Sequence, residues 1–256
     1  MARDNDVNDV EVLSRSCDDP FVCNHVLHDG HTGRLLSAVF SQDMRWVCTA
    51  STDQTARLWP IGWCNFAEPK TLSGHTDFVS SAMFSEDGAL VVTSSYDNTA
   101  KIWNASTGEC TMTLRGHTDW VESAVFSHGG DVLTASQDCT AKLWTASGHL
   151  LQTFTGHTHY VISAVSSKHG PWGEHGASVV TASADGTAKL WNAVTGECTM
   201  TLRGHDDWVI SAVFSLDIVL TVSDRGTVKI WNLFTGDCIR TFDRANDGIF
   251  MSAMLA

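Results

Sequence analysis

A Gly-His pair recurs five times along the chain, and its regular spacing constrains the fold more than any other feature. Successive pairs are separated by 44, 42, 40 and 48 residues. Each unit also ends in an aliphatic residue followed by Trp. Such a period indicates an array of similar units, each too small to bury its own apolar surface, rather than two unrelated domains. The pairs are Gly30-His31, Gly74-His75, Gly116-His117, Gly156-His157 and Gly204-His205, and the closing pairs are Leu58-Trp59, Ile102-Trp103, Leu143-Trp144, Leu190-Trp191 and Ile230-Trp231.

Four residue types recur at fixed offsets within the units: the His, a Thr four residues before an Asp, the Asp itself, and the Trp six residues after it. The fifth unit has Arg225 at the place of the Asp, with an acid one residue earlier at Asp224. The four sets are His31, Thr49, Asp53, Trp59; His75, Thr93, Asp97, Trp103; His117, Thr134, Asp138, Trp144; and His157, Thr181, Asp185, Trp191, while the fifth unit keeps His205, Thr221 and Trp231.

Between these residues lie short stretches rich in Val and Thr, as expected of β-strands packed between neighbours. The period and the recurring residues together resemble the WD-repeat family of β-propellers, in which each repeat supplies the four strands of one blade. The resemblance covers residues 21–256. The Asp that usually follows the Trp is replaced in every unit, by Pro60, Asn104, Thr145, Asn192 and Asn232.

The resemblance implies an all-β WD-repeat propeller with five complete four-stranded blades and a partial sixth. The partial blade would combine an N-terminal outer strand at 21–28 with a C-terminal inner strand at 249–254. Family members usually have seven blades. The chain is therefore either a piece of a longer, truncated array or a ring that closes imperfectly, whose open strand edges would favour self-association.

The composition limits the partners that the chain can bind. Its formal net charge is -13, which argues against nucleic acid and favours a basic protein or peptide. No apolar run approaches the roughly 20 residues of a membrane helix, so no membrane partner is expected. Residues 1–20 carry six acids and are expected to form a disordered tail without a secretory leader, which indicates a cytoplasmic or nuclear protein.

No cofactor or metal is expected. Cys110, Cys198 and Cys238 occupy one repeated position and should lie on separate blades as buried thiols. His169, Glu174 and His175 belong to an insertion at 168–176 whose spacing matches no tight zinc pattern.

In the WD-repeat family the recurring residues form a hydrogen-bonded chain inside each blade, from Trp to Thr to His to Asp, and the resemblance implies the same here. Thr, His and Asp also suggest a nucleophilic triad. A catalytic site is needed once, however, whereas a structural device is needed in every blade, so repetition argues against catalysis.

Family members usually bind their partners on the narrow face of the propeller. The resemblance places on that face the residues three and five after each His and the residue before the Asp. Four of the five residues three after His are aromatic, and half-exposed they would present roughly 400 Å² of apolar surface, enough to mark a binding site. The candidates are Arg34, Leu36, Phe78, Tyr96, Trp120, Glu122, Tyr160, Ile162, Trp208 and Ile210.

Residues 104–127 and 192–215 differ at only three of 24 positions. Trp208 therefore repeats Trp120 either because binding requires it or because the repeat was copied recently. One difference, Glu122 against Ile210, falls on the expected face.

These observations predict a non-enzymatic scaffold that binds a peptide or protein on its narrow face. Within binding proteins, the alternative is a sensor or substrate-recruiting module of a larger protein, resembling incompatibility and innate-sensor proteins or ubiquitin ligases. From another class, the alternative is a propeller hydrolase that uses one His-Asp pair.

Overall fold

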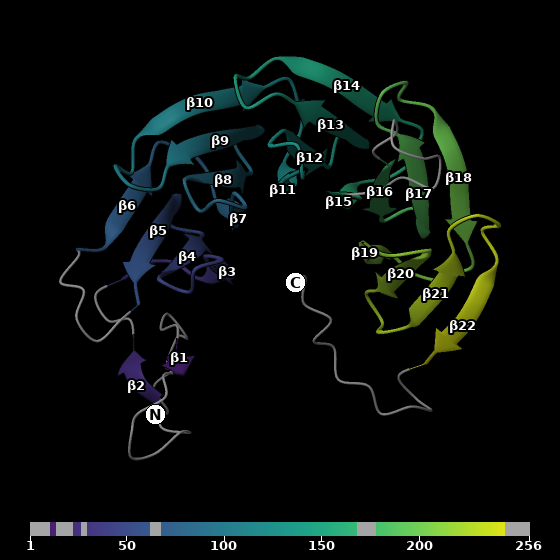
Figure 1. Cartoon of the computed structure of the whole chain (residues 1–256), viewed down its shortest axis with the longest axis horizontal. Coiled ribbons are helices and arrows are strands. Elements are labelled where there is room, and N and C mark those ends of the chain that lie inside the picture. Colours follow the sequence, from purple (N-terminus) through teal and green to yellow (C-terminus); the bar gives the residue numbers. More distant parts are fainter. Residues whose placement is uncertain (1–10, 14–22, 27–29, 62–67, 168–177, 244–256) are drawn as a thin grey trace, which may run out of the picture.

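The computed structural model describes residues 11–13, 23–26, 30–61, 68–167 and 178–243. The described chain is all-β and is built mainly of five four-stranded antiparallel sheets. In each sheet the order of the strands follows the sequence, so strands that are consecutive in the chain are neighbours in the sheet. The five sheets are the blades of an open arc, with the first strand of each blade on the inside and the last on the outside (Figure 1). The expected all-β fold with five complete blades is confirmed.

The strands of each blade have these bounds. Blade one has β3 (Leu35–Phe40), β4 (Trp46–Ser51), β5 (Thr55–Pro60) and β6 (Lys70–Ser73). Blade two has β7 (Val79–Phe84), β8 (Leu90–Ser95), β9 (Thr99–Asn104) and β10 (Cys110–Arg115). Blade three has β11 (Val121–Phe126), β12 (Val132–Ser136), β13 (Thr140–Trp144) and β14 (Leu150–Thr155). Blade four has β15 (Val161–Ser166), β16 (Ser178–Ser183), β17 (Thr187–Asn192) and β18 (Cys198–Arg203), and blade five has β19 (Val209–Ser215), β20 (Ile218–Ser223), β21 (Val228–Asn232) and β22 (Cys238–Phe242).

The hydrophobic core lies between blades rather than within them. From blade two onward, the front face of each blade packs on the back face of the blade before it, and similar positions form all four layers. The Gly before the first strand of a blade has no side chain and so leaves room for the Trp ring of that blade. A Cβ added to Gly116, at φ 150°, would lie only 3.1 Å from the Trp144 ring. In the first layer the back face of blade one contributes Cys48, Ala50, Ala56, Leu58 and Leu72, and the front face of blade two contributes Val79, Ala82, Phe84, Val91 and Trp103.

The first strand of every blade has a β-bulge at its second residue. In blade three, Val121 pairs with Ser136 and Ser123 pairs with Ala135, so Glu122 is left out of the ladder. A bulge twists the strand and re-aims the side chain that it leaves unpaired. The bulged residues are those five after each His, namely Leu36, Ser80, Glu122, Ile162 and Ile210.

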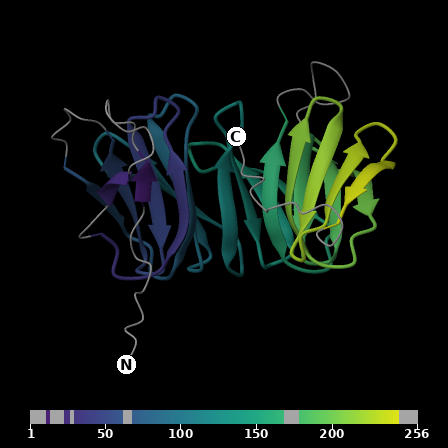
Figure 2. The same ribbon diagram turned by 90° about the horizontal axis from the view of Figure 1, so that it is seen from below.

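The two ends of the arc leave one blade face each without a neighbouring four-stranded blade among the described residues (Figures 1 and 2). On the front face of blade one, Phe40 is 52% exposed, whereas the equivalent Phe84 in blade two is 9% exposed. On the back face of blade five, Leu220 and Ile230 are half-buried, whereas the matching residues of blades one to four are buried, except for the half-buried Leu143. The interior blades are therefore packed on both sides and the end blades on one.

The expected sixth blade does not assemble within the described residues. Cys23–Val26, inside the predicted outer strand at 21–28, forms β2 and pairs with β1 (Glu11–Leu13) instead of joining the last blade. This pair lies at the blade-one end of the arc in Figure 1. Pairing with a segment close in sequence closes a shorter loop than pairing across the open end of the arc, and so costs less entropy. The predicted inner strand at 249–254 lies outside the described residues.

Strand β1 falls within residues 1–20, where the sequence predicts a disordered tail, and its Val12 is a good strand former. The prediction of buried thiols was wrong for Cys110, Cys198 and Cys238, which are exposed because each begins the outer strand of its blade.

The insertion that holds His169, Glu174 and His175 lies outside the described residues. In the described ranges no helix is long and apolar enough to cross a membrane.

Candidate functional site

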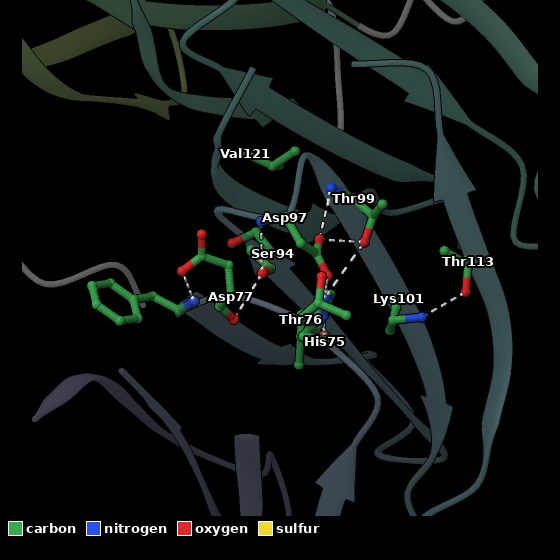
Figure 3. A network of polar contacts seen from close by, with 12 residues as sticks. His75, Thr76, Asp77, Ser94, Asp97, Thr99, Lys101, Thr113 and Val121 are labelled. Atoms are coloured by element: carbon green, nitrogen blue, oxygen red, sulfur yellow. Dashed lines mark hydrogen bonds and ion pairs between the residues drawn. The ribbon is translucent and has the colours of Figure 1, made fainter. Parts of the chain in front are cut away.

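A chain of hydrogen bonds links the recurring residues of blade two. Trp103 Nε1 donates to Thr93 Oγ1 at 2.9 Å, and this hydroxyl lies 2.8 Å from His75 Nε2. His75 Nδ1 lies 2.8 Å from Asp97 Oδ2, and Thr99 Oγ1 donates to the other carboxylate oxygen at 2.6 Å (Figure 3). A carboxylate only accepts hydrogen bonds, so the His proton belongs on Nδ1 and Thr93 donates to Nε2. The chain therefore runs from Trp to Thr to His to Asp.

The same connections join the recurring residues of blades one, three and four. In these blades the Nδ1 to carboxylate distances are 2.8, 2.7 and 2.7 Å, and the Nε2 to Thr hydroxyl distance is 2.7 Å in each. The Trp Nε1 to Thr distance is 2.9 Å in each of the three. The linked sets are His31, Thr49, Asp53, Trp59; His117, Thr134, Asp138, Trp144; and His157, Thr181, Asp185, Trp191.

Electrostatics holds these networks in one charge state. Burial alone would raise the pKa of Asp97, but hydrogen bonds from His75 and Thr99 outweigh it and keep that pKa well below its usual range. Bonds from Thr187 and His157 likewise outweigh burial at Asp185 and lower its pKa to about 2. The carboxylates are therefore ionised at neutral pH, and each of the four blades keeps a fixed acceptor for its His.

Two more residues of the hydrogen-bonded network in each blade were not predicted from the sequence. A Ser two before each Asp and a Thr two after it recur in the first four blades, as Ser95 and Thr99 do in blade two. Ser95 Oγ accepts the backbone N–H of Asp97 at 3.1 Å, and Thr99 binds the Asp carboxylate. The recurring Ser-x-Asp-x-Thr spacing is visible in the sequence and could have revealed both.

Blade five lacks the last link of the chain. His205 Nε2 lies 2.7 Å from Thr221 Oγ1, and Trp231 Nε1 donates to the same hydroxyl at 2.7 Å. Arg225 occupies the place of the Asp and pairs outward with Asp207 at 3.0 Å. His205 Nδ1 is buried without a hydrogen-bond partner among the described residues. Burial, with a smaller contribution from Lys229, lowers the pKa of His205 to about 4.

The His-Asp pairs of blades one to four are largely shielded from solvent. In blades one to four the His side chains are at most 2% exposed and the Asp side chains 7% or 8%. The Thr hydroxyl that a triad would use as nucleophile already accepts from Trp and donates to His. The arrangement orders each blade, because a satisfied buried network favours one packing.

The aromatic candidates gather into two groups on one face. Tyr96 stacks on Trp120 with ring centroids 4.2 Å apart and planes 7° apart, and Phe78 lies 6.0 Å from Tyr96. These rings come from the loop before β7, the β8–β9 turn and the loop before β11, so they cross from blade two to blade three. In the second group the ring centroid of His159 lies 4.2 Å from that of Tyr160 and 6.0 Å from that of Trp208. His159 therefore links blades four and five.

The aromatic residues are presented outward by the residue before each of them. Asp119 Oδ1 accepts the backbone N–H of Trp120 at 2.8 Å, and Asp77 and Asp207 do the same for Phe78 and Trp208. His159 Nδ1 accepts from the Tyr160 N–H at 2.9 Å. The face thus alternates carboxylates with rings. The four aromatic residues three after His are 36% to 47% exposed.

The other candidates lie apart from the two groups or deeper in the face. Arg34 and Leu36 are exposed on blade one, outside both ring groups, and Ile162 and Ile210 are half-buried bulge residues of blades four and five. Glu122 lies at the corresponding bulge of blade three, where the Gln137 side-chain N–H donates to its carboxylate at 2.5 Å. His159 was not among the residues expected on this face, whereas Gln137, the residue before Asp138, occupies one of the positions expected there.

The comparison with family models matches the family described as WD domain, G-beta repeat, at residues 21–60, 67–104, 108–145, 148–192 and 196–232. No individual curated protein matches the chain significantly. The five matches cover more than half of the chain. Each match contains the first three strands of one blade, and matches two to five also contain the last strand of the blade before it. Repeats of this family generally mediate protein–protein interactions, and proteins that contain them are typically non-enzymatic scaffolds. The chain therefore belongs to the WD-repeat family.

Proposed function

We propose that the protein is a non-enzymatic interaction module that binds a peptide or an extended segment of a protein, preferably basic, across the face formed by blades two to five. The observation that carries the proposal is the alternation of half-exposed rings with carboxylates on that face. Large aromatic residues dominate the energetics of interfaces. Asp77 and Asp119 beside the rings, together with the net charge of -13, favour a cationic partner.

Two further features agree with a binding role. The bulges re-aim the residues five after each His, so they vary without disturbing the ladder, as Ser80, Glu122 and Ile162 illustrate. The exposed thiols Cys110 and Cys198 stay reduced in the cytoplasm or nucleus, where we propose that the protein acts.

The near-identity of residues 104–127 and 192–215 favours a second candidate, a sensor or recruiting module of a larger protein whose face changes between copies of the repeat. None of the three positions that differ is buried, and one of them, Glu122 against Ile210, lies on the face. A hydrolase remains disfavoured because the His-Asp pairs are buried.

The test is a selection of random twelve-residue peptides displayed on phage, carried out in parallel on the wild-type chain and on a Trp120→Ala/Trp208→Ala variant. The matched control is Leu151→Ala/Phe234→Ala, which removes side chains that are 51% and 57% exposed outside the ring groups. We expect the wild type and the control to enrich the same peptides and the Trp variant to lose them. Equal enrichment by all three folded proteins would contradict binding at this face.

A further inference from the structure

Glu122 is an acidic side chain held at the junction of two blades. Its bulge in β11 frees it from the ladder, and its backbone carbonyl accepts a 3.4 Å hydrogen bond from Ser94 of blade two. Its carboxylate is half-buried and accepts from Gln137 of its own blade, and the hydroxyl of Tyr96 from blade two is a second donor. Two neutral donors from neighbouring blades therefore orient the carboxylate.

No positive charge compensates Glu122 within the described part of the chain. Gln137 and Tyr96 are neutral, and none of the described ion pairs includes this carboxylate. Burial raises the pKa of Glu122, and the nearby Asp119 raises it further. A half-buried carboxylate without a cation gains more from an added positive charge than a fully solvated carboxylate does.

The rings beside Glu122 add a second element of recognition. Tyr96 and Trp120 are nearly parallel and closely stacked, so no ligand fits between them, but Trp120 is 41% exposed. A planar guanidinium stacks on such a ring and still donates to a carboxylate at its edge, which a compact ammonium does less well. The neighbouring acid and flat ring therefore favour arginine over lysine.

We propose that Glu122, Tyr96 and Trp120 form a subsite for one arginine side chain of the bound peptide, with Glu122 as the acceptor that selects it. This inference rests on the proposed function of the face and names the chemistry that the face selects. The bulge positions of the other blades hold Leu36, Ser80, Ile162 and Ile210, none of which carries a charge. The acidic bulge residue of blade three therefore fixes where along the face the arginine binds.

The test compares peptide selections on the wild type and on Glu122→Ile. Ile occupies the same bulge in blades four and five, so this substitution suits the fold. We expect arginine to be enriched at one peptide position on the wild type and not on Glu122→Ile. The highest-affinity wild-type peptide is then made with citrulline, the neutral isostere of arginine. We expect this change to weaken binding to the wild type about tenfold or more and to leave binding to Glu122→Ile nearly unchanged.

A Glu122→Ile/Ile210→Glu variant separates local recognition from overall charge, because it keeps the net charge of the chain. Ala184 of blade four, rather than a tyrosine, precedes the Asp at the corresponding junction. We expect this variant to stay insensitive to citrulline, and melting curves establish that each variant is folded.

The arginine subsite would be overturned if citrulline weakened peptide binding equally on the wild type and on Glu122→Ile. It would also be overturned if citrulline weakened binding to the Glu122→Ile/Ile210→Glu variant. Either result would leave the proposed face intact. Enrichment without arginine on the wild type would do the same. Failure of the proposed function gives a different result, in which the Trp120→Ala/Trp208→Ala variant enriches the wild-type peptides.

Discussion

At the scale of single residues, the least satisfied group among the described networks is His205 of blade five. Its Nδ1 lacks the acceptor that Asp97 or Asp138 supplies elsewhere. Arg225→Asp would place a carboxylate at the aligned position and remove an ion pair between the exposed Arg225 and the partly exposed Asp207, and ion pairs near the surface stabilise little. We expect the free energy of unfolding to rise by about 1 kcal/mol, the net contribution of one buried hydrogen bond to a charged group less the repulsion from nearby acids.

Urea unfolding monitored by Trp fluorescence measures this change. Arg225→Ala is the control, because it loses the same ion pair without gaining an acceptor. An Arg225→Asp variant no more stable than Arg225→Ala would contradict the role assigned to the missing Asp.

The same residue gives a pH dependence. The pKa of His205 is about 4 in the folded protein, whereas an unperturbed His has a pKa of 6.5, so the unfolded chain binds more protons between these pH values. Stability should therefore fall as the pH falls from 6.5 towards 4. In Arg225→Asp a carboxylate faces the imidazole and raises its pKa, so the slope over this window should be shallower. Unfolding free energies across the window test this, and identical slopes would contradict it.

At the scale of a strand, the first strands of blades two and three differ in how they satisfy the hydroxyl of one serine. Ser81 Oγ in β7 lies 2.6 Å from Ser94 Oγ and accepts from the Ala124 N–H of blade three at 3.3 Å. Ser123 occupies the same place in β11, but Ala135 replaces the partner serine. The Ser123 hydroxyl is buried and has no partner within the described residues.

The pair Ser81→Ala and Ser123→Ala therefore has opposite expected effects. Ser81→Ala should destabilise by about 1 kcal/mol, because it removes a hydrogen bond and a contact between blades. Ser123→Ala should be neutral or slightly stabilising, because it deletes a buried group that gains nothing in the folded state. Thermal unfolding of both variants decides this, and an equal loss in both would count against the difference between the blades.

At the scale of the whole molecule, the order of unfolding should follow from the open arc. Repeat arrays are stabilised largely by interfaces between neighbours, and blades one and five each have one such interface among the described strands. Blade five also has the incomplete network at His205. We expect amides of β20 and β21 to exchange faster with solvent than those of β12 and β13 or of β16 and β17.

Hydrogen exchange resolved by strand measures this order. Arg225→Asp is the internal control and should slow exchange in blade five alone. Uniform protection across the five blades would contradict an arc with weaker ends. Self-association at the open ends, expected from the sequence, stays a prediction that light scattering over a range of concentrations can test.

The sequence by itself determined the class of fold and the five units. The spacing of Gly-His and Trp encodes one blade, and a unit of about forty residues buries its apolar faces only by stacking on neighbours. The fixed offsets of His, Thr, Asp and Trp likewise placed each polar network inside one blade, because all of its members lie within a single repeat. The replacement of the Asp by Arg225 in the fifth unit could be recognised from the sequence for the same reason.

The tertiary structure alone decided the contacts between blades. Stacking of Tyr96 on Trp120 and the position of Glu122 depend on a bulge and on the relative rotation of two blades, which no pattern within one repeat specifies. The pairing of β2 with β1, in place of a strand joined to the last blade, arises from competition between near and distant partners. The repeated sequence pattern specifies the strands and the polar network within each unit, whereas these features depend on how neighbouring units pack together.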